Sequence, residues 1–135
     1  MNTMTLTRPA EQHACRLRLT AGPAAAALAR RQIRVVLQAW LARVDPDIAV
    51  LLTSDLVTDA LRRQVGGTIT LAIACDDDHL RVEVHGAAPL LPWPADTRVA
   101  PGPGVILVAR LAQEWGRYRT PEGEAAYFTL NLESS

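Results

Sequence analysis

Two carboxylates, Asp55 and Asp59, stand one helical turn apart in a stretch that otherwise has a helical apolar pattern. Carboxylates at this spacing can bind a divalent cation, or can orient a group that attacks a phosphate. Arg62 and Arg63 follow within a turn, so Asp59 can instead form an ion pair inside the protein. Spacing alone leaves three interpretations open: an exposed helix end with an Asp59–arginine pair, a helix face lining a pocket, or a purely structural cation site.

The segment from 46 to 64 is predicted to be the helix that positions these side chains. Asp45-Pro46 provides a capping acceptor and a proline at the first helical position, and Gly66-Gly67 ends the helix. A helix packed on a core does not normally place two carboxylates on its apolar face. That face joins apolar and charged residues: Ile48, Leu51, Leu52, Asp55, Asp59 and Arg62.

Length and composition restrict the classes of protein to be considered. The 135 residues are enough for one domain, expected over 12–135 after a flexible N-terminus at 1–11. The net charge is zero and no basic patch stands out, so neither nucleic acid nor a membrane is expected as a partner. All 14 basic residues are arginines, which excludes a Schiff-base lysine and a phosphate-loop lysine.

The two cysteines and the hydropathy pattern predict the compartment. Cys15 and Cys75 are isolated and lack metal-ligand spacing, so we expect buried free thiols. No signal peptide and no apolar run of membrane-spanning length are present. These features together predict a cytoplasmic protein.

The remaining periodicities predict an α/β (α+β) two-layer sandwich. Strands joined by tight turns favour an antiparallel sheet, and the helices must then share one face of it. His85 is expected to be a surface or structural residue, and 76–78 an acidic turn without calcium. The predicted elements are strands at 13–19, 68–75, 80–85, 117–120 and 124–132, helices from 24 to about 44 and from 105 to 115, and a proline-rich loop from 86 to 104.

Five segments in order then carry a resemblance to a known family. Residues 53–60, Thr-Ser-Asp-Leu-Val-Thr-Asp-Ala, resemble the Ser-Glu-Leu-Val-Thr-Asn-Ala helix of the anti-sigma-factor serine kinases. These kinases are a branch of the histidine kinase, gyrase and Hsp90-like ATPase superfamily. Residues 102–108 resemble the family's phosphate turn, and the other similar segments are 80–84, 111–116 and 123–128. The resemblance implies a Bergerat-type fold: a mixed, mostly antiparallel sheet of about five strands, covered on one face by three helices.

The resemblance also implies roles for individual residues, with ATP and magnesium as cofactors. Asp55 matches the catalytic glutamate, and Asp59 matches the asparagine that binds magnesium. Arg62 and Arg63 follow on the same helix, and the resemblance implies that they contribute to nucleotide binding. Gly86 stands where the family has its adenine-reading aspartate, and the phosphate turn corresponds to Gly102, Gly104 and Val105.

Several of these positions depart from the family pattern in ways that weaken nucleotide binding. Asp55 is one methylene shorter than glutamate, and Gly86 has no carboxylate to accept the adenine amino proton. Ala125 replaces a threonine, and Pro103 removes one N–H donor from the phosphate turn. An internal Asp59–arginine pair can replace the metal altogether.

These departures favour a regulatory protein with an impaired nucleotide site. By resemblance, its partner is a sigma factor or an anti-sigma-antagonist-like protein, with a homodimer as a further possibility. The alternative is an active ATP-dependent serine/threonine kinase, in which Asp55 is the base and Asp59 the magnesium ligand.

Overall fold

A computed structural model of the chain describes residues 13–64, 66–86 and 106–133. Along the chain, one strand is followed by two helices, then by two strands, a third helix and two final strands. They are β1 (His13–Thr20), α1 (Ala25–Ala39), α2 (Pro46–Arg63), β2 (Thr68–Cys75), β3 (His79–His85), α3 (Ile106–Leu111), β4 (Glu114–Thr120) and β5 (Gly123–Asn131).

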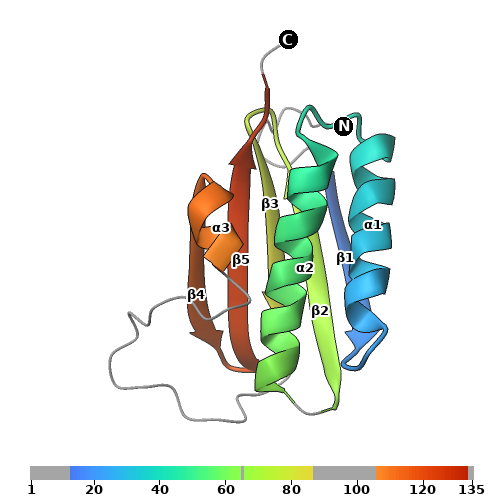
Figure 1. The fold of residues 1–135 in the computed structure, drawn as a ribbon, viewed down its shortest axis with the longest axis vertical. Coiled ribbons are helices and arrows are strands. Elements are labelled where there is room, and N and C mark those ends of the chain that lie inside the picture. The colour runs from blue at the N-terminus through green and yellow to red at the C-terminus, as the bar shows by residue number, and fades with distance from the viewer. Residues whose placement is uncertain (1–12, 65, 87–105, 134–135) are drawn as a thin grey trace, which may run out of the picture.

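The strands form one open sheet in the order β1-β2-β3-β5-β4. All four neighbouring pairs are antiparallel, so a mixed sheet is not found among the described strands. The three described helices lie together on one face of this sheet (Figure 1). The predicted two-layer α+β sandwich is therefore confirmed at this level, with β1 and β4 at the two edges of the sheet.

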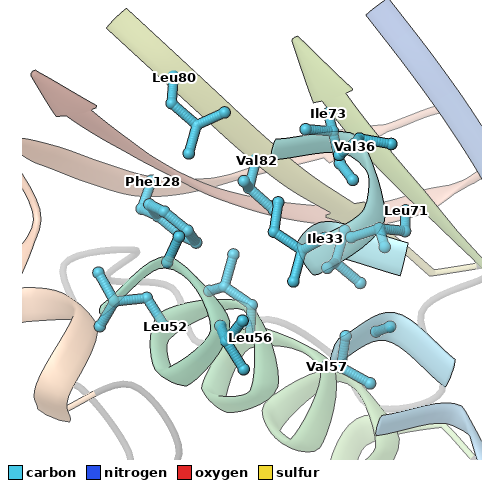
Figure 2. Packing of buried hydrophobic residues seen from close by; sticks show 14 of the residues in the cluster. Ile33, Val36, Leu52, Leu56, Val57, Leu71, Ile73, Leu80, Val82 and Phe128 are labelled. Atoms are coloured by element: carbon cyan, nitrogen blue, oxygen red, sulfur yellow. The ribbon is translucent and has the colours of Figure 1, made fainter. Parts of the chain in front are cut away.

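The core fills the space between the helices and the sheet. Every second residue of β2 and β3 is buried, because alternate side chains of a strand point to opposite faces of the sheet. Helix α2 contributes Leu52, Leu56 and Val57, which are all fully buried. Figure 2 shows them facing side chains of the sheet and of α1: Ile33, Val36, Leu71, Ile73, Leu80, Val82 and Phe128.

Helix α2 begins as the sequence predicts. The Asp45 side chain accepts hydrogen bonds from the backbone N–H of Asp47 (2.9 Å) and of Ile48 (3.4 Å), and Pro46 takes the first helical position. The predicted acidic turn is also confirmed, since Asp76 Oδ1 accepts from the backbone N–H of Asp78 and His79. Cys75 is buried and Cys15 half-buried, and both are free thiols.

Helix α1 ends at Ala39, although its apolar pattern predicted a helix to about residue 44. The chain leaves the helix at Leu41, whose φ of 54° is in the left-handed region. The N–H of Ala42 bonds to the carbonyl of Leu37, and that of Leu41 to the carbonyl of Gln38, which together form a Schellman cap. Glycine usually occupies this position, so the sequence carried no signal for the early end.

The third helix is also shorter than the predicted span of 105–115. Helix α3 ends at Leu111, and Trp115 and Gly116 belong to strand β4 instead. Trp115 pairs with Phe128, and Gly116 pairs with Tyr127, whose ring covers it. A Cβ on Gly116 would lie 2.9 Å from Tyr127 Cε1, so the glycine serves close cross-strand packing and does not end a helix.

Within the described residues, no helix is long and apolar enough to cross a membrane. The predicted flexible segment 1–11 lies outside those residues, as does all of the proline-rich loop except Gly86.

The strained position at Leu41 yields a test of the fold. The Leu41 side chain is 83 % exposed, so removing it loses little packing, while glycine adopts a positive φ without steric cost. We expect Leu41→Gly to raise the free energy of unfolding by about 1 kcal/mol, measured by urea denaturation. Arg31→Gly, at an exposed position inside α1, should instead lower it by about 1 kcal/mol. Destabilisation by Leu41→Gly would contradict the described cap.

Candidate functional site

Asp59 of α2 points toward the sheet and is only 6 % exposed. Arg117 of β4 donates a hydrogen bond from Nη2 to Asp59 Oδ2 at 2.7 Å. Arg63, one turn further along α2, places its Nε 3.3 Å from the same oxygen. The carboxylate therefore meets two guanidinium groups, which compensate the cost of burying its charge.

A second carboxylate completes this cluster. Glu124, at the start of β5, lies with its Oε1 3.4 Å from Nη1 of Arg63. We call Asp59, Arg63, Arg117 and Glu124 the Asp59 network. Its two acids and two arginines come from α2, β4 and β5, and their formal charges sum to zero. The network ties the C-terminal end of α2 to the edge strand β4 and to its neighbour β5.

The space beside the Asp59 network is small. The cavity has a volume of about 30 Å³, which suffices for about one water molecule. Apolar and small side chains make up the rest of its wall, in addition to the network: Leu56, Ala60, Val84, Ala125 and Ala126. A nucleotide base does not fit this volume unless the side chains around it move.

Gln64 occupies the place beside Gly86 at the end of the cavity. Its side chain is held by hydrogen bonds from Nε2 to the carbonyls of Gly66 (2.8 Å) and Thr68 (3.1 Å). Its Oε1 lies 2.9 Å from where a Cβ on Gly86 would be. A larger residue at Gly86 therefore requires the Gln64 side chain to move. The space that a side chain at Gly86 would need, where the resembled family has its adenine-reading aspartate, is thus filled by the Gln64 amide.

The structure separates the residues that the sequence grouped on one helix face. Asp59, Arg63 and Gly86 line the cavity, whereas Asp55 and Arg62 do not. Arg62 is exposed, and it is Arg63 that pairs with Asp59. Gly102, Gly104 and Val105, the predicted phosphate turn, lie outside the described residues.

Asp55 is half-buried on α2, one turn before Asp59. Burial in the protein raises the pKa of the Asp55 carboxyl above its ordinary value. A carboxylate with a raised pKa accepts a proton more readily near neutral pH, which is a property of a general base.

The donor set around Asp59 does not fit a magnesium ion. Magnesium requires oxygen ligands in near-octahedral geometry, and the nearest charged groups to Asp59 Oδ2 are two guanidinium groups. Within the described part of the chain, no group of three or more histidine, cysteine, aspartate or glutamate side chains is arranged to hold a metal ion. A cation at Asp59 would have to displace both arginines.

Site roles for Arg117, Glu124 and Gln64 were not expected from the sequence. Arg117 had a usable signal. It shares one face of a predicted strand with Arg119, Tyr118 is on the other face, and one of the two faces had to meet the helices. Glu124 and Gln64 carried no comparable signal. Their roles depend on the pairing of β4 with β5 and on how α2 crosses the sheet.

Comparison with known proteins does not assign the chain to a family. No family model matches the chain, and a search of curated proteins finds no match.

Removal of the central carboxylate tests the Asp59 network. Asp59→Ala leaves Arg63 and Arg117 close together without the negative charge between them, and Arg117 has a side chain only 9 % exposed. Breaking a buried ion pair on one side costs about 3–5 kcal/mol, and we expect a loss near 3 kcal/mol because Glu124 still pairs with Arg63. Arg62→Ala, at the neighbouring exposed arginine, should change stability by less than about 0.5 kcal/mol in the same urea titration. Equal effects of the two variants would contradict this geometry.

The raised pKa of Asp55 gives a pH-dependent prediction. Because the pKa is higher in the folded than in the unfolded state, the ionised carboxylate destabilises the fold above both values, and this penalty disappears below the unfolded value. Asp55→Asn should therefore be more stable than the parent protein at pH 7 and equally stable at pH 3, below the ordinary aspartate pKa of about 3.9. Thermal unfolding at both pH values measures this difference. A gain of equal size at pH 3 would show that the carboxylate charge is not its cause.

Proposed function

We propose that this chain is a regulatory protein built on a Bergerat-type ATP-binding domain of the anti-sigma serine kinase kind. It acts by binding a protein partner, and its nucleotide site is impaired. The two-layer arrangement of helices on an antiparallel sheet and the sequence resemblance support the fold. The observation that carries the functional proposal is the engagement of Asp59 by both Arg63 and Arg117.

This engagement impairs nucleotide binding because the ion pairs of Asp59 must break first. Asp59 can coordinate a magnesium ion only after separating from two guanidinium groups, one of them at 2.7 Å. Breaking buried ion pairs of this kind costs about 3–5 kcal/mol. A micromolar ligand has about 8 kcal/mol of binding free energy, so a cost of 3 kcal/mol weakens it about a hundredfold. The loss of a carboxylate at Gly86 adds to this penalty.

The resemblance suggests the kind of partner. A sigma factor or an anti-sigma-antagonist-like protein in the cytoplasm is the proposed partner, and the role is regulation of transcription. A homodimer is compatible with the same proposal. Loss of ATP binding leaves these interactions possible, because they use the outer surfaces of the domain.

One observation favours a competing function, an active ATP-dependent serine/threonine kinase. The raised pKa of Asp55 suits a general base that takes the proton from an attacking hydroxyl group. In this case the arginines of the Asp59 network would have to swing away on nucleotide binding, to leave Asp59 free for magnesium.

Isothermal titration with ATP and magnesium tests the proposal directly. We expect no binding by the parent protein up to about 1 mM ATP, because the Asp59 network must break before the nucleotide can bind. A triple variant, Asp59→Asn, Gly86→Asp and Gln64→Ser, removes the ion pair, supplies the missing carboxylate and clears the space beside it. We expect this variant to bind ATP more tightly than the parent protein.

The outcomes distinguish impairment from kinase activity. A micromolar dissociation constant for the parent protein would contradict the proposal. Transfer of radiolabelled phosphate to a partner protein, abolished by Asp55→Ala but not by Arg62→Ala, would establish the kinase instead. Circular dichroism of each variant provides the control for folding.

A further inference from the structure

The sheet has a second face, on which no described helix packs (Figure 1). Its side chains alternate with the buried ones along each strand. At one end this face is hollowed, with a volume of about 360 Å³. The hollow is lined by polar and charged side chains, chiefly Arg16, Arg18, Thr68, Thr70, His85 and Glu122. It opens on the opposite side of the sheet from Asp59, although Gly86, directly after β3, lines both this hollow and the cavity beside Asp59.

Two arginines form the cationic wall of this hollow. Arg16 and Arg18 alternate with the half-buried Leu17 on β1, so both point to the uncovered face, about 6.8 Å apart along the strand. Both are exposed, and neither has an ion pair or hydrogen bond to another side chain within 13–64, 66–86 and 106–133. This differs from Arg63 and Arg117, whose charges are compensated inside the protein.

The strand register places hydroxyl and imidazole groups next to these arginines. Arg18 is opposite Thr70, and Thr70 in turn is opposite His85. Directly opposed residues in antiparallel strands have Cβ atoms about 4.5–5.5 Å apart, so the three side chains form one row across β1, β2 and β3. Thr68 and Thr120 line the same hollow from β2 and from the end of β4. His85 Nε2 is buried, and Oε1 of Glu83 lies 3.6 Å from it, just beyond hydrogen-bond distance.

We propose that this hollow binds a phosphate monoester. Guanidinium groups match phosphate oxygens in a fork geometry, and threonine hydroxyl groups donate further hydrogen bonds to them. The hollow is considerably larger than a phosphate group, so it has room for the alcohol that carries the phosphate. Because its described lining contributes two arginines, the site suits one dianionic group and not a nucleic acid backbone, which needs a longer basic surface. The proposal does not depend on the function proposed for the Asp59 side of the sheet.

Glu122 is a negatively charged residue in the hollow, so its removal should change the phosphate affinity in the direction opposite to the removal of an arginine. It lines the hollow from the turn between β4 and β5, and its carboxylate repels a phosphate. Neutralising it should therefore strengthen binding, whereas removal of an arginine should weaken it. A nonspecific effect of net charge would instead appear equally at exposed charged residues far from the hollow.

The test uses the full chain and two phosphate monoesters at constant ionic strength, followed by amide NMR titration. The probes are glycerol 3-phosphate and a blocked phosphoserine hexapeptide, with the unphosphorylated peptide and inorganic phosphate as controls. We expect Arg18→Ala to weaken binding of the monoester about tenfold or more, and Glu122→Gln to strengthen it about threefold. Arg31→Ala, at an exposed arginine of α1, should leave the affinity unchanged.

The two probes distinguish the possible sources of the ligand. Tighter binding of the phosphopeptide supports the proposal with a phosphorylated protein as the source, and tighter binding of glycerol 3-phosphate supports it with a small metabolite. No shift of the Thr68, Thr70 or His85 amides at 20 mM of either monoester would overturn it. Equal weakening by Arg18→Ala and Arg31→Ala would overturn it as well, because binding would then follow overall charge.

Discussion

A buried carboxylate must be compensated, and in this protein the need applies to Asp59. Its side chain is buried between α2 and the sheet, where an unpaired charge would cost several kcal/mol. Arg117 on β4 and Arg63 on α2 compensate it, and Glu124 on β5 then compensates Arg63. One buried charge thus links α2, β4 and β5. It also determines how little space remains among them.

The apolar core holds these elements at the distance that the ion pairs require. Leu52, Leu56 and Val57 fix α2 against the sheet (Figure 2), and the Asp45 cap fixes the start of the helix. With the helix held in this way, Asp59 falls on the inner side one turn beyond Leu56. The same positioning turns Arg63 inward and leaves Arg62 in solvent. The site is therefore a consequence of core packing, and any nucleotide would have to compete with contacts that already stabilise the fold.

Local signals were sufficient to predict most of the architecture. The capped start of α2, the alternation of β2 and β3, and the acidic turn between these strands could be read from neighbouring residues. The early end of α1 could not, because Leu41 adopts a conformation that normally indicates glycine. Trp115 and Gly116 were assigned to a helix because an apolar residue followed by glycine resembles a helix end. In the structure, Trp115 pairs with Phe128 and Gly116 with Tyr127, and this cross-strand pairing places both residues in strand β4.

The candidate site was predictable only in part, because it also depends on contacts between residues that are distant in the sequence. The sequence left open an ion pair between Asp59 and Arg62 or Arg63, but it could not show that Arg117, 58 residues away, would be the arginine closest to Asp59. A double-mutant cycle between Asp59→Asn and Arg117→Gln, measured by urea unfolding, tests this pairing most directly. The account predicts a coupling free energy of at least about 2 kcal/mol. A coupling below about 0.5 kcal/mol would contradict it, since Asp59 would then be free to serve a nucleotide-bound cation.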